Sequence, residues 1–324
     1  MEGCVSIAQF PAPDQAGAVE SHEMRFICAD GVLLAGHLWR SGRGQAVVIV
    51  NPATGVLARY YHRYAAFLAE RGFDVVTYDY RGIGASRPAS LRGCGYRWRD
   101  WGTLDFAAVL DGAERMAAGR PIMVVGHSIG GFLPGLAQGF DRCAGMISVA
   151  AQFAYWRAYE RSARLRLVLR WHLIMPLMTA LMGYFPGRRL GWLEDLPAGV
   201  AYEWAFRGPR VERSFPPEDR DEILRRLAAF RGPLLAITTT DDPYGAPGPS
   251  IARSPITRAP KDRASSCRPR ISAWRMWVIS TCSMRATGTR SGRRRQGGSK
   301  AAAATGACPR APQSPCPRDI GATP

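Results

Sequence analysis

The residues with the clearest chemical signature lie in VVGHSIGG, where Gly126-His127-Ser128-Ile129-Gly130 has the spacing Gly-x-Ser-x-Gly. An apolar run precedes the serine, and a helical pattern follows it. A strand that turns directly into a helix forces the serine into a strained backbone conformation, and side chains at the two glycines would collide. The turn would hold the Ser128 hydroxyl clear of the sheet and place the next N–H groups at a helix N-terminus, where negative charge is favoured. The pattern predicts a nucleophile, and a glycine-rich turn that binds phosphate is the alternative.

The elements around this motif predict an α/β fold with a mostly parallel sheet and helices on both faces. MRFICADGVLLAGHLW indicates two strands joined at Asp30-Gly31. Short apolar runs predict further strands in QAVVIV, FDVVTYD, PIMVVG, CAGMISVAA and PLLAITTT. Helical patterns separate them in RYYHRYAAFLAERG, around 102–118 and in SIGGFLPGLAQG. Buried strands that alternate with helices are typical of a parallel sheet.

Residues 152–225 have a different composition, rich in Trp, Tyr, Met and Arg. They interrupt the strand and helix alternation between two predicted strands. We expect a helical insertion that covers the carboxyl ends of the strands, where open α/β sheets bind ligands. An oligomer contact or ordinary packing is the alternative.

VVGHSIGG, together with YDYRGIGASRP after an earlier strand and TTTDDPYGAP after a later one, resembles the α/β-hydrolase superfamily. The run NPATGVLARYYHRYAAFLAERGFDVVTYDYRGIGASRP and the segment EDLPAGVAYEW are similar to predicted bacterial hydrolases near the serine aminopeptidases. The resemblance covers about residues 24–247. It divides the chain into an N-terminal extension (1–23), a hydrolase core (24–151 and 226–247), the helical insertion (152–225) and a tail (248–324).

The resemblance implies roles for particular residues. Ser128 matches the nucleophile, and the Ile129 N–H matches one donor of the oxyanion hole. Ala53 takes the place of the second donor, although Asn51-Pro52 departs from the His-Gly that more often begins this loop. Asp242 matches the acid of the triad. Asp241 is the rival, and both aspartates could instead only shape a turn.

The histidine that should complete the triad is absent from its expected place. Such triads run Ser, then Asp or Glu, then His along the chain. The chain has five histidines, at positions 22, 37, 62, 127 and 172, and all precede Asp242. We expect His127 to be a wall residue and His62 a surface or packing residue. His172, in the insertion, is the one that could approach the site.

The tail offers an explanation for the missing histidine. The net charge of +17 divides into +4 for residues 1–247 (28 Arg, 24 acidic) and +13 for residues 248–324 (15 Arg and Lys, 2 acidic). When the codons for Ala273 to Gly292 are shifted by one base, Met276-Trp277 forces Val and Trp277-Val278 forces Gly. A His-Phe can follow, as in related hydrolases. We therefore expect a frameshift near Pro247-Gly248 and a disordered, low-complexity tail. With the frame shifted, we expect the last strand and the last helix of the fold to be missing. A basic tail that grips phosphates is the opposing interpretation.

These features favour an enzyme of the serine hydrolase class that acts on a small molecule with an acyl or amide bond. The missing base would cripple such an enzyme.

The eight cysteines include no C-x-x-C pair, so we expect no metal and no cofactor. We expect a cytoplasmic protein without a nucleic-acid partner, and the oligomeric state stays open. We expect no membrane partner, because the longest apolar run, 171–185, is shorter than the ~20 residues of a membrane span. The alternatives are a non-catalytic pocket protein that retains the serine, and an insertion that lies on a membrane surface.

Overall fold

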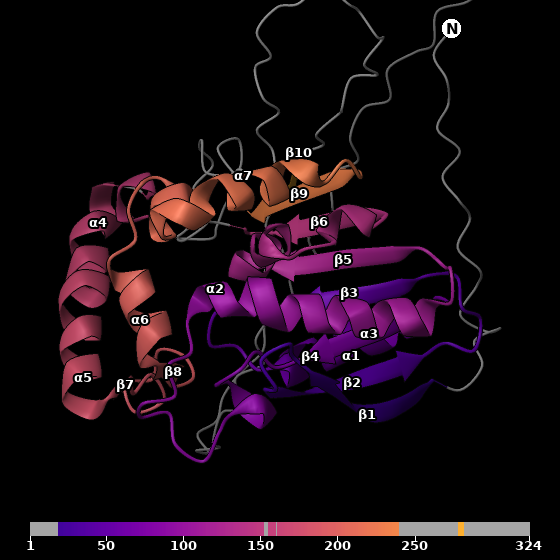
Figure 1. The fold of residues 1–324 in the computed structure, drawn as a ribbon, viewed down its shortest axis with the longest axis horizontal. Helices are drawn as coiled ribbons and strands as arrows, with labels where there is room; N and C mark the ends of the chain where they lie inside the picture. The colour runs from indigo at the N-terminus through magenta and orange to yellow at the C-terminus, as the bar shows by residue number, and fades with distance from the viewer. Residues whose placement is uncertain (1–18, 152–154, 160, 240–277, 282–324) are drawn as a thin grey trace, which may run out of the picture. The chain divides into compact units, whose positions relative to one another are not determined.

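A computed structural model describes residues 19–151, 155–159, 161–239 and 278–281. These residues belong to one compact unit, Met1–Ser283. Its main sheet has the strand order β1-β2-β4-β3-β5-β6-β9-β10 (Figure 1). The strands are β1 (Glu20–Ile27), β2 (Leu33–Arg40), β3 (Val47–Asn51), β4 (Asp74–Tyr78), β5 (Ile122–His127), β6 (Gly145–Val149), β9 (Leu234–Thr239) and β10 (Val278–Thr281). β1 and β2 pair antiparallel, β2 pairs antiparallel with β4, and the strands from β4 to β10 are parallel, which confirms the predicted fold class.

Helices pack on both faces of this sheet because consecutive residues of its central strands point to opposite sides. Val47 and Ile49 of β3 join a large apolar cluster that includes residues of α3. Val48 and Val50 join a second cluster with Ala65 of α1. The core helices are α1 (His62–Ala69), α2 (Trp98–Asp100), α3 (Ala107–Ala117), which continues the π-helical turn η4 (Trp101–Phe106), and α7 (Arg220–Ala229).

Between β6 and α7 the chain forms a group of helices beside the sheet (Figure 1). The elements are α4 (Arg161–Val168), the π-helical turn η9 (Leu169–Ile174), α5 (Met175–Met182), β7 (Tyr184–Phe185), β8 (Leu196–Pro197) and α6 (Ala198–Ala205). This group contacts the loops that follow β3 and β4. The Glu194 N–H donates to the Gly55 carbonyl at 3.0 Å, and Arg87 pairs with Asp195 at 2.9 Å. These loops lie at the carboxyl end of the sheet.

Two details differ from the sequence predictions. The helix expected after Ser128 is instead two short 3₁₀ turns, η5 (Ser128–Gly131) and η6 (Leu133–Leu136). Pro134 lacks an N–H to continue an α-helix, and Phe132 between the turns has φ −113°, outside helical values. The last strand of the sheet, which we expected to be missing, is present as β10, which pairs with β9 through Val278 and Ala236. Its last helix would fall outside the described residues.

Candidate active site

Ser128 occupies the turn at the carboxyl end of β5, the central strand between β3 and β6. Its φ is +53°, which few non-glycine residues adopt. The strand ends at His127 and the 3₁₀ turn η5 begins at Ser128, so the serine lies at the tip of the reversal. The side chain is half-buried, and among the described residues none forms a hydrogen bond with it. Such strain is kept where the surrounding structure enforces it.

The two glycines of the motif are required by close backbone contacts. A Cβ on Gly126 would lie 2.2 Å from the Gly130 carbonyl oxygen. A Cβ on Gly130 would lie 2.4 Å from the Asn51 oxygen and 2.6 Å from the Pro52 oxygen. The turn is therefore pressed against the loop that follows β3. This contact brings the predicted oxyanion residues Ile129 and Ala53 onto neighbouring segments.

The 3₁₀ geometry changes the electrostatics expected beside Ser128. η5 has four residues, and the Phe132 N–H already donates to the Ile129 carbonyl at 2.9 Å. A turn this short does not have the aligned dipoles of an α-helix. The first N–H groups of any helical turn still lack an acceptor inside it. The N–H of Ile129, the predicted oxyanion donor, is therefore not reinforced by the field of a following α-helix.

The Ala53 N–H belongs to a hydrogen-bonded chain that the sequence did not reveal. It donates to the Tyr61 hydroxyl oxygen at 3.0 Å. That hydroxyl also lies 2.8 Å from Nδ1 of His127. Burial raises the pKa of Tyr61 to about 12, so the phenol keeps its proton at neutral pH. Tyr61 thus connects Ala53, the predicted oxyanion donor, to His127, which precedes the predicted nucleophile.

Asn51, which departs from the usual His-Gly at the start of this loop, is fully buried. Its side-chain oxygen accepts a hydrogen bond from the Tyr78 hydroxyl at 2.8 Å. Its amide nitrogen donates to the Gly130 carbonyl at 3.4 Å. The asparagine thereby links β4 to the turn that carries Ser128, and its role is to position that turn.

No histidine hydrogen-bonds Ser128, and all five lie among the described residues. His22 lies 3.3 Å from Glu20 on β1. His37 and His62 contact each other, with ring centroids 4.6 Å apart. His127 contacts Tyr61, and His172 packs against Trp156 with ring centroids 6.3 Å apart. Burial lowers the pKa of His62 and of His172, which favours their neutral forms. The predicted packing role of His62 agrees with these contacts.

Asp79 and Arg81 hold the loop that follows β4. The Asp79 carboxylate accepts hydrogen bonds from the Ala58 N–H at 2.7 Å and the Ala85 N–H at 2.9 Å. Arg81 is buried and pairs with Asp105 at 2.6 Å and with Asp30 at 2.5 Å. Every charge in this cluster has a partner, so the cluster stabilises the loop next to the site.

Asp242 and its rival Asp241 lie outside the described residues, so their roles stay predictions. The strand that precedes them, β9, pairs with β6 through Ile237 and Val149. Within the described ranges, no group of three His, Cys, Asp or Glu side chains could hold a metal ion.

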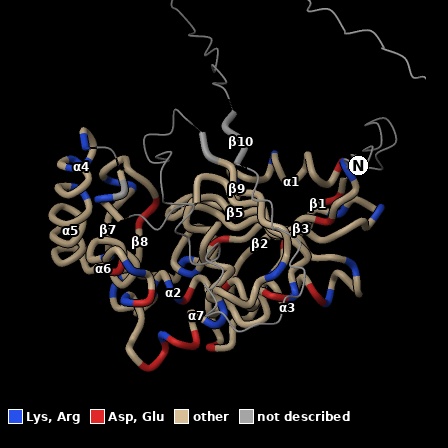
Figure 2. The backbone as a smooth tube through the Cα atoms, turned by 90° about the horizontal axis from the view of Figure 1, so that it is seen from above, with Lys and Arg blue, Asp and Glu red and all other residues tan. Residues whose placement is uncertain are grey.

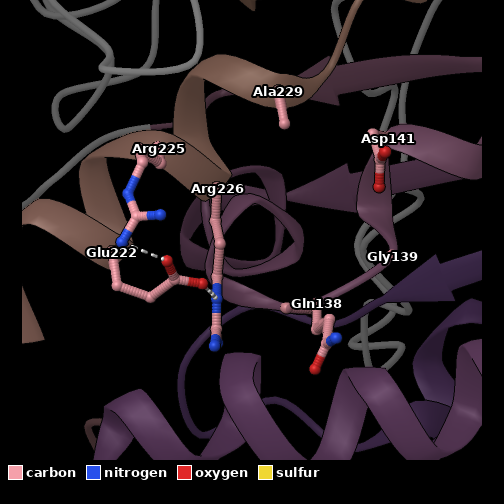
Figure 3. A pocket seen from close by; sticks show the side chains of 8 residues that line it. Gln138, Gly139, Asp141, Glu222, Arg225, Arg226 and Ala229 are labelled. Carbon is pink, nitrogen blue, oxygen red and sulfur yellow. Dashed lines mark hydrogen bonds and ion pairs between the residues drawn. The ribbon is translucent and has the colours of Figure 1, made fainter.

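A hollow of about 250 Å³ lies elsewhere, between α7 and the segment after η6 (Figure 3). Its charged side chains neutralise one another, because Glu222 pairs with both Arg225 and Arg226 at 2.8 Å. Ser128 is not among its lining residues. We assign no chemistry to this hollow.

The sheet order and the strained serine turn after its central strand define an α/β hydrolase. The model of the family described as serine aminopeptidase, S33, matches residues 42–213, more than half of the chain. The chain belongs to this family. The matched range includes both segments of the candidate site, from Ala53 and Tyr61 to Ser128.

The chain is similar in fold to solved structures that are described as a lipase, an esterase and an α/β hydrolase. A soluble variant of monoglyceride lipase from Saccharomyces cerevisiae aligns with a TM-score of 0.50 and 17% identity, over 73% of this chain and 82% of the lipase. An esterase from Pyrococcus furiosus aligns with a TM-score of 0.47 and 16% identity, over 74% of this chain and 77% of the esterase. An α/β hydrolase from Penicillium sp. sh18 aligns with a TM-score of 0.46 and 19% identity, over 70% of this chain and 82% of that hydrolase. At these identities the likeness to the yeast lipase concerns the fold. A comparison with curated proteins gave no match.

Proposed function

We propose that the chain carries the site of a serine hydrolase that transfers an acyl group from a small-molecule ester or amide to water. The observation that carries this proposal is the strained Ser128, held at φ +53° by two glycines that no other residue could replace without a clash. Ala118 and Ala150 also have positive φ values, so the strain alone does not single out Ser128. What distinguishes it is a strained residue with a hydroxyl group, placed between two clash-limited glycines directly after the central strand. The Ser128 hydroxyl oxygen would attack the substrate carbonyl and form a tetrahedral intermediate.

The Ile129 N–H would stabilise the negative oxygen of this intermediate from one side. The Tyr61 hydroxyl would stabilise the same oxygen from the other side. When His127 carries its proton on Nδ1, the Tyr61 oxygen accepts hydrogen bonds from both His127 and the Ala53 N–H. The Tyr61 hydroxyl proton is then free to point at the oxyanion. Ala53 would act through Tyr61 in this arrangement, and one donor of this kind is typically worth ~10²–10³ in rate.

The proton of the Ser128 hydroxyl must pass to a base and then to the leaving group. Asp242 would orient a histidine for this purpose, but this chain has no histidine after Asp242. The described contacts of the five histidines offer no substitute base at Ser128. We therefore expect little turnover from the chain as printed, and the alternative is a protein that binds a small molecule without converting it.

The helical group between β6 and α7 would cover the carboxyl end of the sheet and shape the substrate pocket. Its contacts with the loops after β3 and β4 support this role. Its aromatic side chains, among them Trp171 and Trp204 with ring centroids 5.6 Å apart, favour an apolar acyl or alkyl group.

A fluorophosphonate probe tests the proposal, because an activated serine oxygen attacks its phosphorus, forms a phosphonate ester and displaces fluoride. For a chain whose reading frame is restored, we expect the mass to increase by one probe, with the adduct on Ser128, and we expect slower labelling of the printed chain. Ser128→Ala should remain unlabelled, and Ser148→Ala, which removes a buried serine of β6, should label as the parent does. The probe should be applied both to the printed chain and to a chain whose reading frame is restored near Pro247. If neither chain is labelled at Ser128, the hydrolase proposal is wrong and the non-catalytic alternative gains support.

A further inference from the structure

A continuous helix of 22 residues, Arg161–Met182, runs through α4, η9 and α5. It has two apolar stripes, each with a spacing of four residues. The inner stripe is buried and consists of Leu167, Trp171, Met175 and Thr179. The outer stripe is exposed and consists of Leu165, Leu169, Leu173, Leu177 and Leu181. The five outer leucines expose between 47% and 81% of their surface, so this helix has an apolar face that nothing in the described structure covers.

The π-helical turn in the middle of the helix explains why residues spaced by four stay aligned along one side of it. In an α-helix with 3.6 residues per turn, each step of four residues rotates the side chain by ~40°. A stripe of five leucines would then wind almost halfway around the helix. The π turn η9 contains more residues per turn, which reduces this rotation. The outer leucines therefore stay on the side away from the inner stripe.

The helix is long and apolar enough to cross a membrane by length and composition alone. Its buried inner stripe argues against a membrane-crossing position, because Trp171 packs against Trp204 of α6 and against Tyr159. The ring centroids of Trp171 and Tyr159 lie 5.4 Å apart. A helix held by one face to a folded protein offers only its other face to a partner. Such a helix can lie flat in the boundary between lipid head groups and acyl chains.

The charge on the helix indicates the kind of surface that it fits. Residues 161–182 contain four arginines and no acidic residue. Figure 2 shows basic segments on α4 and no acidic segment on α4 or α5. Arg161 and Arg166 are exposed beside the leucines. Two copies of this helix placed face to face would bring arginines together without acidic partners on the helix. Anionic head groups would pair with these arginines.

We propose that the outer face of Arg161–Met182 docks on an anionic lipid surface, with the five leucines inserted and the arginines on phosphate groups. This inference goes beyond the proposed hydrolase function and does not depend on it.

The test is co-sedimentation of the full chain with vesicles of phosphatidylcholine, with and without phosphatidylserine. We expect binding to the anionic vesicles. Leu169→Ser/Leu173→Ser/Leu177→Ser should weaken it by ~10³-fold, because each of the three inserted leucines contributes roughly tenfold. Arg161→Gln/Arg166→Gln should weaken binding to anionic vesicles and reduce its salt dependence. The matched control is Ile27→Ser/Leu33→Ser/Leu224→Ser, which removes three exposed apolar side chains elsewhere and should bind like the parent. Circular dichroism checks that each variant folds.

The basic tail could also attract anionic vesicles, but the leucine variant keeps the tail intact. If that variant binds as tightly as the parent, the tail accounts for binding and the proposal is overturned. Light scattering provides the second readout. A parent dimer that the leucine variant converts to monomer, without vesicle binding by either, would overturn the lipid proposal and assign the stripe to a second copy of the chain.

Discussion

At the scale of single residues, the candidate site depends on a turn that tolerates almost no added volume. The sequence predicted the glycines at 126 and 130 from the general geometry of a strand that reverses at a serine. The structure adds which atoms forbid a side chain: the Gly130 carbonyl for position 126, and the Asn51 and Pro52 carbonyls for position 130. These are backbone atoms, which cannot move aside as the end of a flexible side chain can.

Gly130→Ala should therefore disturb both the turn and the loop after β3. We expect the free energy of unfolding to fall by ~1–3 kcal/mol, the usual cost of overpacking, and labelling of Ser128 to be lost. Chemical denaturation and intact-mass analysis measure the two effects. Gly208→Ala is the control, because a Cβ at Gly208 meets nothing within 4 Å. Normal labelling of Gly130→Ala would show that the turn does not require this glycine.

Tyr61 was not predicted from the sequence, although it lies inside the run NPATGVLARYYHRYA that supported the family resemblance. In the sequence, the neighbouring residues Tyr60 and Tyr61 both fit the helical pattern, and nothing in that pattern distinguishes their roles. Their environments differ, since Tyr60 is 67% exposed whereas Tyr61 bonds Ala53 and His127. Only the tertiary contact between the β3 loop and the Ser128 turn distinguishes them.

Tyr61→Phe should slow fluorophosphonate labelling of Ser128 by ~10²-fold, because the phenylalanine cannot donate to the developing oxyanion. The stability should change by only about 1 kcal/mol, the net value of a typical hydrogen bond. Tyr60→Phe is the matched control and should label at the parent rate. An unchanged labelling rate for Tyr61→Phe would leave Tyr61 with a structural role and return the second oxyanion contact to the Ala53 N–H.

At the scale of elements, short apolar runs were sufficient to predict the strands that surround the site. Runs such as VVIV and DVVTY are buried on both faces, and β-branched residues suit that environment. The segment after Ser128 could not be predicted as well, because SIGGFLPGLAQG has apolar residues at helical spacing. Its glycines and Pro134 lower helix stability, and close packing against the β3 loop selects the shorter 3₁₀ turns.

The contact between α6 and α2 connects the helical insertion to the core and should respond to pH. Glu203 of α6 accepts the Trp98 N–H at 3.0 Å and lies 3.8 Å from both Arg97 and Arg99. Its burial raises the pKa of Glu203 to about 7, despite these arginines and the nearby Arg207. A carboxyl group whose pKa is raised by folding stabilises the fold fully below the unfolded value of ~4.3. This contribution is lost as the pH rises through 7.

Glu203→Gln should remove this part of the pH dependence. We expect the unfolding free energy of the parent to decrease between pH 4.5 and 7.5, relative to this variant, by at most about 3 kcal/mol. The glutamine can still accept the Trp98 N–H. Urea titrations across this range measure the difference, with Glu218→Gln, an exposed substitution, as the control. Parallel stability curves for Glu203→Gln and the parent would mean that Glu203 does not titrate in this range.

At the scale of the whole molecule, the chain combines a nearly balanced first part with a strongly basic tail. The first 247 residues carry a net charge of +4 and the remaining 77 carry +13. The first part contains the motif, the predicted oxyanion loop and all five histidines, and among the described residues none of these histidines hydrogen-bonds Ser128. A site with a strained serine and its supporting loop, but without a base, is what a shifted reading frame after Pro247 would produce.

We therefore expect the DNA across the codons for Tyr244 to Ser250 to contain one base more or fewer than the intact gene. A chain with the restored frame should regain a Gly-His-Phe near position 278, and its turnover of an activated ester should exceed that of the printed chain by up to ~10⁶-fold, the typical cost of losing a triad histidine. Replacing the regained histidine with alanine should return the turnover to the level of the printed chain. An unchanged DNA sequence would contradict the frameshift. Equal turnover by the printed and restored chains would contradict the role of the regained histidine, and the base would then have to come from a group already present in the first part.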